Sequence, residues 1–155
     1  MAIKDTNRKP FIEDNDTNVK IGIDLPIRRG SKDGFFASTS TTIEAVKNNI
    51  RNLLQTNPGE RFFQPSFGID LRKYSFNQID NDTLFSIQDE ILDKFEFWLP
   101  FVQVKDIKIN NGDGNKLLVN VIFNIQSDPN TLTSVQIDVN NGDNTTDNTT
   151  IESGR

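Results

Sequence analysis

The sequence predicts an α+β fold in which two main helices pack on a small, mostly antiparallel sheet. Two segments, 43–54 and 84–98, repeat apolar residues at intervals of three and four, the spacing of a helix with one buried face. From residue 102 to 139 apolar and polar residues alternate instead, which is the period of a strand. Turn residues rich in Asn, Asp and Gly divide that part into runs, so we expect hairpins and antiparallel pairing.

Composition excludes several classes of function. The 155 residues suit one domain with tails, and a hydrophobic share of 34% indicates that part of the chain adds no core. Because the chain has no Cys and no His, it lacks thiol chemistry, the usual zinc ligands and the usual general base, so we expect no cofactor. A net charge of -5 argues against nucleic-acid binding, and no apolar run of about 20 residues predicts a membrane span.

The N-terminal part is expected to contribute little core. Residues 1–18 are polar and show no sustained period, so they predict a flexible arm with one docked segment around Phe11 and Ile12. Residues 19–24 alternate in the manner of a short edge strand, which Pro26 ends because proline cannot donate to a sheet ladder. A small basic cluster follows at Arg28, Arg29 and Lys32.

The first helix has a strong start signal and a strong stop signal. Thr41-Thr42-Ile43-Glu44 predicts a capping box, in which a hydroxyl and a carboxylate three residues apart satisfy free backbone N–H groups. Asn57-Pro58-Gly59 ends the helix. The predicted buried stripe consists of Ile43, Val46, Ile50, Leu53 and Leu54.

A corner then leads into the second long helix. Residues 60–65 are aromatic and bounded by turn signals, which predicts an extended connection. Gly68 is expected at a positive φ, and Asp70 is expected to cap a brief helix over 71–75. The long helix should begin after the Asp80-Asn81-Asp82 cluster. Its predicted buried stripe is Leu84, Ile87, Ile91, Phe95 and Trp98, with Pro100 just past its end.

The remaining elements are strands. The alternation slips at Lys105-Asp106, which predicts a bulge, and 110–115 predicts a hairpin connection. Residues 117–125 are apolar on both faces, so we expect a central strand with helix on one face and a partner on the other. A turn at 128–130 and a final strand around Val135, Ile137 and Val139 follow. Residues 141–155 predict a disordered polar tail, which leaves 19–140 as the folded domain.

The sequence gives only weak support for a catalytic site or a metal site. A glycosidase needs two carboxylates about 5 to 10 Å apart, and the candidates Glu60, Asp70, Glu90 and Glu96 have no spacing that fixes a pair. The Asp80-Asn81-Asp82 run lacks the regular ligand order of a calcium loop, so we expect no metal. No catalytic residue is assigned.

The Glu60-Arg61 pair has two interpretations. In the first, Glu60 pairs with a backbone turn or with Arg72 and fixes the corner between helix and sheet. In the second, the charged pair lies on a surface that meets another subunit.

Several segments together resemble the lysozyme-like baseplate wedge family of contractile phage tails, to which a type VI secretion baseplate subunit is related. They are Gly22–Pro26, the helix from Thr41 through Leu53-Leu54-Gln55-Thr56 to Gly59-Glu60-Arg61, and Pro65–Leu71 with its Gly-x-Asp-Leu ending. The resemblance covers about residues 19–140, which it identifies as a baseplate wedge domain. We take the word lysozyme in the family description as a label, because no acid pair is defined.

The resemblance implies a structural subunit without enzymatic activity, present in each wedge of a sixfold baseplate and monomeric when alone. Its implied partners are the other wedge proteins, through their helical core bundle, and the tail sheath protein, whose assembly it would template. The implied location is the tail baseplate of the virion, reached after assembly in the host cytoplasm as a late protein. Two alternatives stay open: a baseplate-associated cell-wall glycoside hydrolase, and a binding module unrelated to tails.

One departure from the family changes the expected bundle contact. Family members often carry Glu-Pro-Arg after the Trp that ends the long helix, whereas this chain has Trp98-Leu99-Pro100-Phe101. The proline is kept and both charges are replaced by apolar residues, so we expect an apolar contact through Leu99 and Phe101.

The templating role has a physical basis in the sheet edges. An open edge presents unpaired N–H and C=O groups that a neighbour can continue by strand addition, and 19–24 and 135–140 are the candidate edges. In the alternative interpretation the edges are merely short and twisted. The expected partner-binding residues are Trp98, Leu99, Pro100, Phe101, Glu60, Arg61, Val135, Ile137 and Val139.

Overall fold

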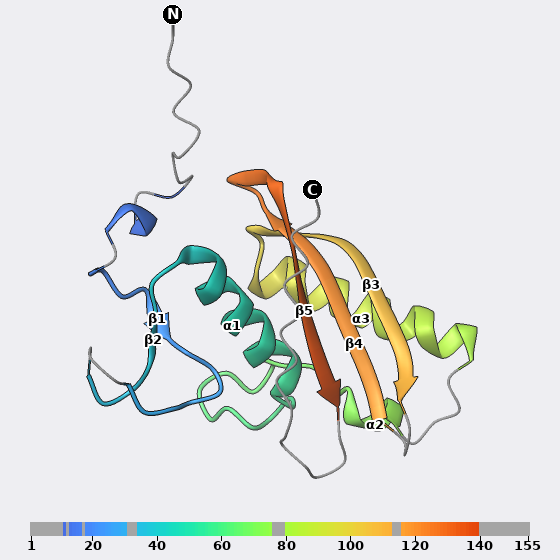
Figure 1. The fold of residues 1–155 in the computed structure, drawn as a ribbon. Helices are drawn as coiled ribbons and strands as arrows, with labels where there is room; N and C mark the ends of the chain where they lie inside the picture. Colours follow the sequence, from blue (N-terminus) through green and yellow to red (C-terminus); the bar gives the residue numbers. More distant parts are fainter. Residues whose placement is uncertain are drawn as a thin grey trace, which may run out of the picture. The chain divides into compact units, whose positions relative to one another are not determined.

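The computed structural model describes residue 11 and residues 13–16, 18–30, 34–75, 80–112 and 116–139 (Figure 1). It confirms the α+β class, with antiparallel pairing throughout the described sheets. The chain divides into two compact units, Met1–Asn49 and Ile50–Arg155. Its elements are η1 (Glu13–Asn15), β1 (Gly22–Ile23), β2 (Ser38–Thr39), α1 (Thr42–Gln55), α2 (Arg72–Ser75), α3 (Asn81–Trp98), β3 (Val102–Gly112), β4 (Lys116–Ile125) and β5 (Asp128–Val139).

The first unit contains a two-stranded sheet. β1 pairs with β2 antiparallel, so that Gly22 lies opposite Thr39 and Ile23 opposite Ser38. The strand predicted at 19–24 is therefore present in shortened form, but its partner β2 was not predicted. Two residues give too little alternation for a strand to be recognised from the sequence.

The start of α1 is held by a residue far away in the chain. The Asp14 carboxylate accepts hydrogen bonds from Thr42 N at 2.7 Å and from Thr42 Oγ1 at 2.9 Å. The predicted capping box is present in one half, since Thr41 Oγ1 accepts from Glu44 N at 3.3 Å. Asp14 thus docks the short η1 turn, close to the docked segment expected around Phe11. Ile12 itself lies outside the described residues, as do 1–10 and the tail 141–155.

The second unit contains a three-stranded sheet with the order β3-β4-β5. The predicted central strand is confirmed, because β4 pairs with β3 on one side and with β5 on the other. The predicted bulge is also confirmed by the register shift between Val104 and Asp106. The turn predicted at 128–130 is wrong. The chain reverses over Gln126 and Ser127, and β5 already begins at Asp128 opposite Ile125.

Helix α3 runs along one face of this sheet (Figure 1). Its N-cap is Asp80, whose carboxylate accepts from Thr83 N at 2.8 Å, so the helix begins at Asn81, inside the cluster after which its start was expected. Gln88 Nε2 donates to Ile107 O at 3.0 Å, which ties the helix to β3. The side chains that α3 and β4 bury in the core are Ile87, Ile91, Phe95, Leu117, Val119, Val121 and Phe123.

The corner between α1 and α2 is a compact loop. Residues 60–65 do not form the extended connection that the sequence predicts, because Gly59 N donates to Pro65 O at 2.8 Å and closes the segment on itself. Gly68 has the expected positive φ, 99°, and Ile69 N donates to Thr56 O at 2.9 Å. Asp70 Oδ1 accepts from Lys73 N at 3.4 Å, as expected for the cap of α2.

Candidate partner-binding surface

The loop from Gly59 to Gly68 is fastened to the C-terminal end of α3. Lys94 Nζ donates to Ser66 O at 2.9 Å, and the Phe67 ring meets the Trp98 ring edge to face with centroids 5.1 Å apart. Both attachments use residues spaced by four on α3, which therefore lie on the same side of the helix. The loop is thus held against α3 at two points.

An aromatic stack joins two of the residues predicted to bind a partner. The Arg61 guanidinium lies 3.7 Å from the centre of the Phe67 ring, an arrangement in which the cation is attracted to the ring face. Phe67 in turn contacts Trp98, and Trp98 contacts Phe97 with centroids 5.0 Å apart. We call Arg61, Phe67, Trp98 and Phe97 the aromatic stack. Through Phe67 the fold brings Arg61 and Trp98 into one surface.

Exposed phenylalanines lie next to both ends of this stack. Phe62 and Phe63 directly follow Arg61, are 91% and 93% exposed, and contact each other edge to face at 5.3 Å. At the other end, Phe97 and Phe101 also remain exposed. Sequence reasoning overlooked Phe62, Phe63 and Phe97. The available signal was an aromatic pair in a loop bounded by turn residues, and a phenylalanine on the polar side of a helix.

The junction after α3 differs from the expectation in one side chain. Phe101 is 39% exposed, but Leu99 is only 7% exposed. Leu99 N donates to Phe95 O at 2.8 Å and Leu99 O accepts from Val102 N at 2.9 Å, so this residue closes the helix and starts β3. Pro100 lies on the surface between them. The expected contact through Leu99 is therefore unsupported in the isolated chain, whereas Phe101 is accessible.

Glu60 stabilises the loop in which it lies. Its carboxylate accepts from Asn57 N at 3.0 Å and from Asn57 Nδ2 at 2.8 Å. The backbone N–H of Asn57, then its side chain, and then the charge of Arg72 lower the pKa of Glu60. These contacts match the first of the two interpretations of the Glu60-Arg61 pair, in which Glu60 fixes the corner.

The three predicted residues of β5 lie elsewhere, in the core. The side chains of Val135, Ile137 and Val139 are buried, and each lies opposite a buried residue of β4. A partner at the edge of β5 could therefore pair with its backbone but would not contact these three side chains. Among the described residues β5 pairs with β4 alone, which leaves its other side as a sheet edge.

Two more of the carboxylates considered for hydrolysis take part in local contacts. Asp70 caps α2, and Glu90 accepts from Tyr74 OH at 2.8 Å and lies 2.9 Å from Lys73 Nζ. The hydrogen bond to Glu90 raises the pKa of Lys73, and burial followed by that same carboxylate raises the pKa of Tyr74. Within the described ranges no three acidic side chains gather in the manner of a metal site. No helix in these ranges is long and apolar enough to cross a membrane.

Two solved structures share the fold. A candidate tail lysozyme from Geobacter sulfurreducens is 23% identical, with a TM-score of 0.57, over 65% of this chain and 92% of that one. A chain of the anti-feeding prophage baseplate is also 23% identical, with a TM-score of 0.52, over 75% of this chain and 81% of its own length. A comparison with curated proteins gives no match.

The sequence also matches a family model over more than half its length. The matching family is described as baseplate wedge protein gp25, and the match runs over residues 40–130. This range contains α1, the loop with Arg61, the whole of α3 and the junction that follows it. The chain therefore belongs to the baseplate wedge protein gp25 family.

Proposed function

We propose that this protein is a structural subunit of a contractile-tail baseplate wedge that binds the helical core bundle of the wedge proteins. Family membership supports the baseplate role. The observation that carries the binding role is the set of exposed phenylalanines around the aromatic stack, namely Phe62, Phe63, Phe97 and Phe101. Aromatic side chains on a rigid support are typical of residues that dominate the binding energy of an interface.

A variant pair tests the bundle contact. We expect Phe97→Asp combined with Phe101→Asp to abolish co-assembly with the other wedge proteins of the same tail, because two charges would be buried without partners. The matched control is Leu132→Asp, since Leu132 is an exposed apolar residue on β5, away from the stack in sequence. Circular dichroism and urea unfolding would verify that both variants fold. Assembly of the double variant at the control's level would refute the bundle contact.

The second part of the proposal concerns the tail sheath. We infer that β5 continues into the sheath by strand addition, because its free side presents backbone groups that β4 does not use. The buried side chains of Val135, Ile137 and Val139 would then hold the edge strand in register instead of contacting the partner. In this role the protein would act in the tail baseplate of the virion, after assembly in the host cytoplasm, in a sixfold arrangement.

Proline substitutions test the edge. Neighbouring residues of a strand point their N–H groups in opposite directions, so of Thr133 and Ser134 one donates toward β4 and the other toward the free side. We expect proline at the outward position to preserve the fold and wedge assembly but to block sheath initiation. Proline at the inward position should destabilise the sheet. The stability of the two variants therefore shows which of the two residues donates toward β4. Normal sheath initiation by the well-folded proline variant would contradict strand addition.

A structural role also predicts that the protein does not cleave peptidoglycan. Of the four acids considered, Glu60, Asp70 and Glu90 are engaged in local contacts. In a turbidity assay on purified cell walls we expect the protein to match a buffer blank. Clearing that disappears in Glu90→Gln would instead support the glycoside hydrolase.

A further inference from the structure

One exposed face of α3 is not explained by the proposed function. Phe85 is 64% exposed and Leu92 is also exposed, and the helical spacing places both on the side opposite the buried Ile87 and Ile91. Four carboxylates share this side of the helix, and in the described part of the chain none of them takes part in an ion pair. We call this set the acidic face: Phe85, Leu92, Asp82, Asp89, Asp93 and Glu96.

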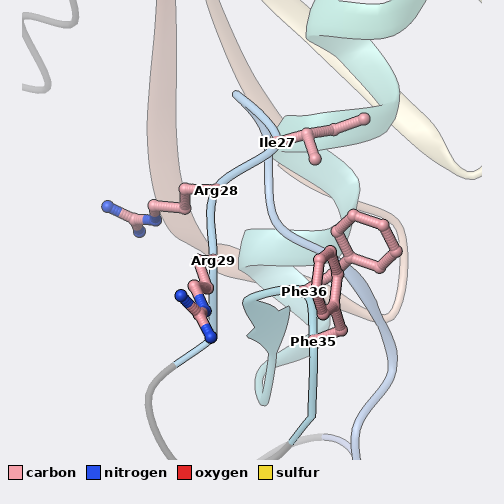
Figure 2. Close-up of a pocket in the computed structure, with 5 residues that line it drawn as sticks. All are labelled: Ile27, Arg28, Arg29, Phe35 and Phe36. Atoms are coloured by element: carbon pink, nitrogen blue, oxygen red, sulfur yellow. The ribbon is translucent and has the colours of Figure 1, made fainter.

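A second unexplained surface has the opposite charge. A shallow pocket of about 260 Å³ is lined by Ile27, Arg28, Arg29, Phe35 and Phe36. Figure 2 shows Ile27 and the two phenylalanine rings on one side of the chain segments and the guanidinium groups extending to the other. Ile27 and Phe35 are well exposed, so the pocket has apolar walls with no cover. We call it the basic pocket.

The basic pocket is built on paired backbone. Gly30 N donates to Phe35 O at 3.1 Å, and Ala37 N donates to Arg28 O at 2.9 Å. A side chain at Gly30 would lie 2.6 Å from Gly34 O, so this hairpin admits only glycine there. Arg28 forms an ion pair with Asp24, whereas among the described residues no such pair involves Arg29. The hairpin therefore presents a preformed apolar hollow with an available positive charge.

The charges of these two surfaces are complementary. Helix α3 carries five acidic residues and one lysine, a formal charge of 1 - 5 = -4. The segment 18–30 carries Lys20, Arg28 and Arg29 against Asp24, a formal charge of 3 - 1 = +2. Surfaces of opposite charge attract over a screening length of about 10 Å at 0.1 M salt.

We propose that the acidic face of one copy docks on the basic pocket of a second copy. In this contact the Phe85 ring enters the hollow between Ile27 and the phenylalanines, and Asp89 pairs with Arg29. A second copy is the occupant because one chain carries both the apolar projection and the hollow, each with the charge that the other lacks. This inference does not depend on the bundle or sheath contacts, and it changes the expectation that the isolated protein is strictly monomeric.

The symmetry of the contact has a consequence. Each copy would use two different surfaces, so one contact between two copies leaves one surface free on each, unless the same two copies also form the reciprocal contact. Such contacts close into a ring when the rotation permits and otherwise grow as a chain. Growth beyond dimers as the concentration rises would indicate single contacts, whereas association that stops at a dimer would indicate the reciprocal pair.

Sedimentation velocity on the full chain tests the proposal. We expect the sedimentation coefficient to rise with concentration at about 0.01 M salt, and association to weaken at about 1 M, where charges are screened within about 3 Å. Phe85→Ser should weaken association by about tenfold or more, equivalent to about 1.4 kcal/mol. The matched control Leu132→Ser removes an equally exposed apolar side chain, 63% exposed, and should associate like the wild type. A wild type that stays monomeric at low salt up to millimolar concentration would overturn the proposal.

A charge exchange then tests the pairing itself. We expect Arg29→Glu alone and Asp89→Lys alone to remain monomeric, because each opposes like charges across the contact. An equimolar mixture of the two should associate, since both of its possible contacts join opposite charges. Lys105→Glu replaces a positive with a negative charge at an exposed residue of β3, as Arg29→Glu does in the pocket. It should leave association intact. Failure of the mixture to associate, with both variants folded, would refute the pairing of Asp89 with Arg29.

Discussion

At the scale of single residues, two positions fix the corner between α1 and α2. Gly68 lies so close to Thr56 that a Cβ atom there would be 2.1 Å from Thr56 O. Glu60 closes the same loop from the other side through Asn57. The position of the aromatic stack thus depends on residues that do not belong to it, because the loop that carries Arg61 and Phe67 is held between these two points.

We predict that Gly68→Ala destabilises the protein far more than Gly59→Ala. Both glycines have positive φ, 99° and 90°, which costs an L-residue of the order of 1 kcal/mol. Only Gly68 adds a backbone clash, since a Cβ atom at Gly59 would meet nothing within 4 Å. Urea unfolding should give a loss of about 1 kcal/mol for Gly59→Ala and about 3 kcal/mol or more for Gly68→Ala. Equal losses would show that the loop relaxes around the clash.

We also predict that Asp14→Ala destabilises the start of α1 by about 1 kcal/mol, the usual effect of a lost helix cap. The carboxylate receives two hydrogen bonds from Thr42, and Asp14 is buried. The control is Asp16→Ala, because Asp16 is exposed and its carboxylate accepts a local hydrogen bond from Asn18 N. Thermal unfolding compares the two variants, and an unchanged melting temperature for Asp14→Ala would contradict the capping role.

At the scale of elements, the regular parts of the fold were predictable and the irregular parts were not. The stripes of α1 and α3 and the bulge before Asp106 each follow from a pattern within a few residues. The pairing of β1 with β2 and the cap of α1 by Asp14 join residues distant in sequence, and no local pattern reports them. The same holds for the candidate site. Arg61 was proposed from the Glu60-Arg61 pair and Trp98 from the family resemblance, but their link through Phe67 needed the fold.

We predict that the contact between α2 and α3 makes the folded protein less stable at alkaline pH. Its Lys73–Glu90 ion pair raises the pKa of Lys73 above its ordinary 10.5, and burial raises the pKa of Tyr74 above 10.0. A raised pKa favours the protonated form in the folded state, so both contributions are complete below the ordinary values and are lost as pH rises through the folded values. Urea midpoints measured from pH 9 upward should therefore fall less steeply for Lys73→Gln than for the wild type. Parallel curves would mean that the pair adds no pH-dependent stability.

At the scale of the whole molecule, hydrophobic burial and the proposed partner contacts use different residues. The core is aliphatic with a few rings, whereas Phe62, Phe63, Phe85, Phe97 and Phe101 stay on the surface. The chain has twelve phenylalanines, but composition does not by itself separate core residues from interface residues. An assembly protein can keep such rings exposed if they become buried against a partner, which is what the proposed bundle and copy-to-copy contacts provide.

Removal of the C-terminal residues 141–155 is a further test at the scale of the whole molecule. Residues 141–155 are rich in Asn, Asp and Thr and contain one aliphatic residue, Ile151, a composition that offers little apolar surface for a core. We expect a chain ending at residue 140 to keep the urea midpoint of the full chain, because the sheet up to Val139 is complete without the tail. The same truncation should leave sheath initiation unchanged if strand addition uses the backbone of β5 itself. A truncated protein that unfolds normally but no longer initiates the sheath would assign the templating role to the tail in place of the edge.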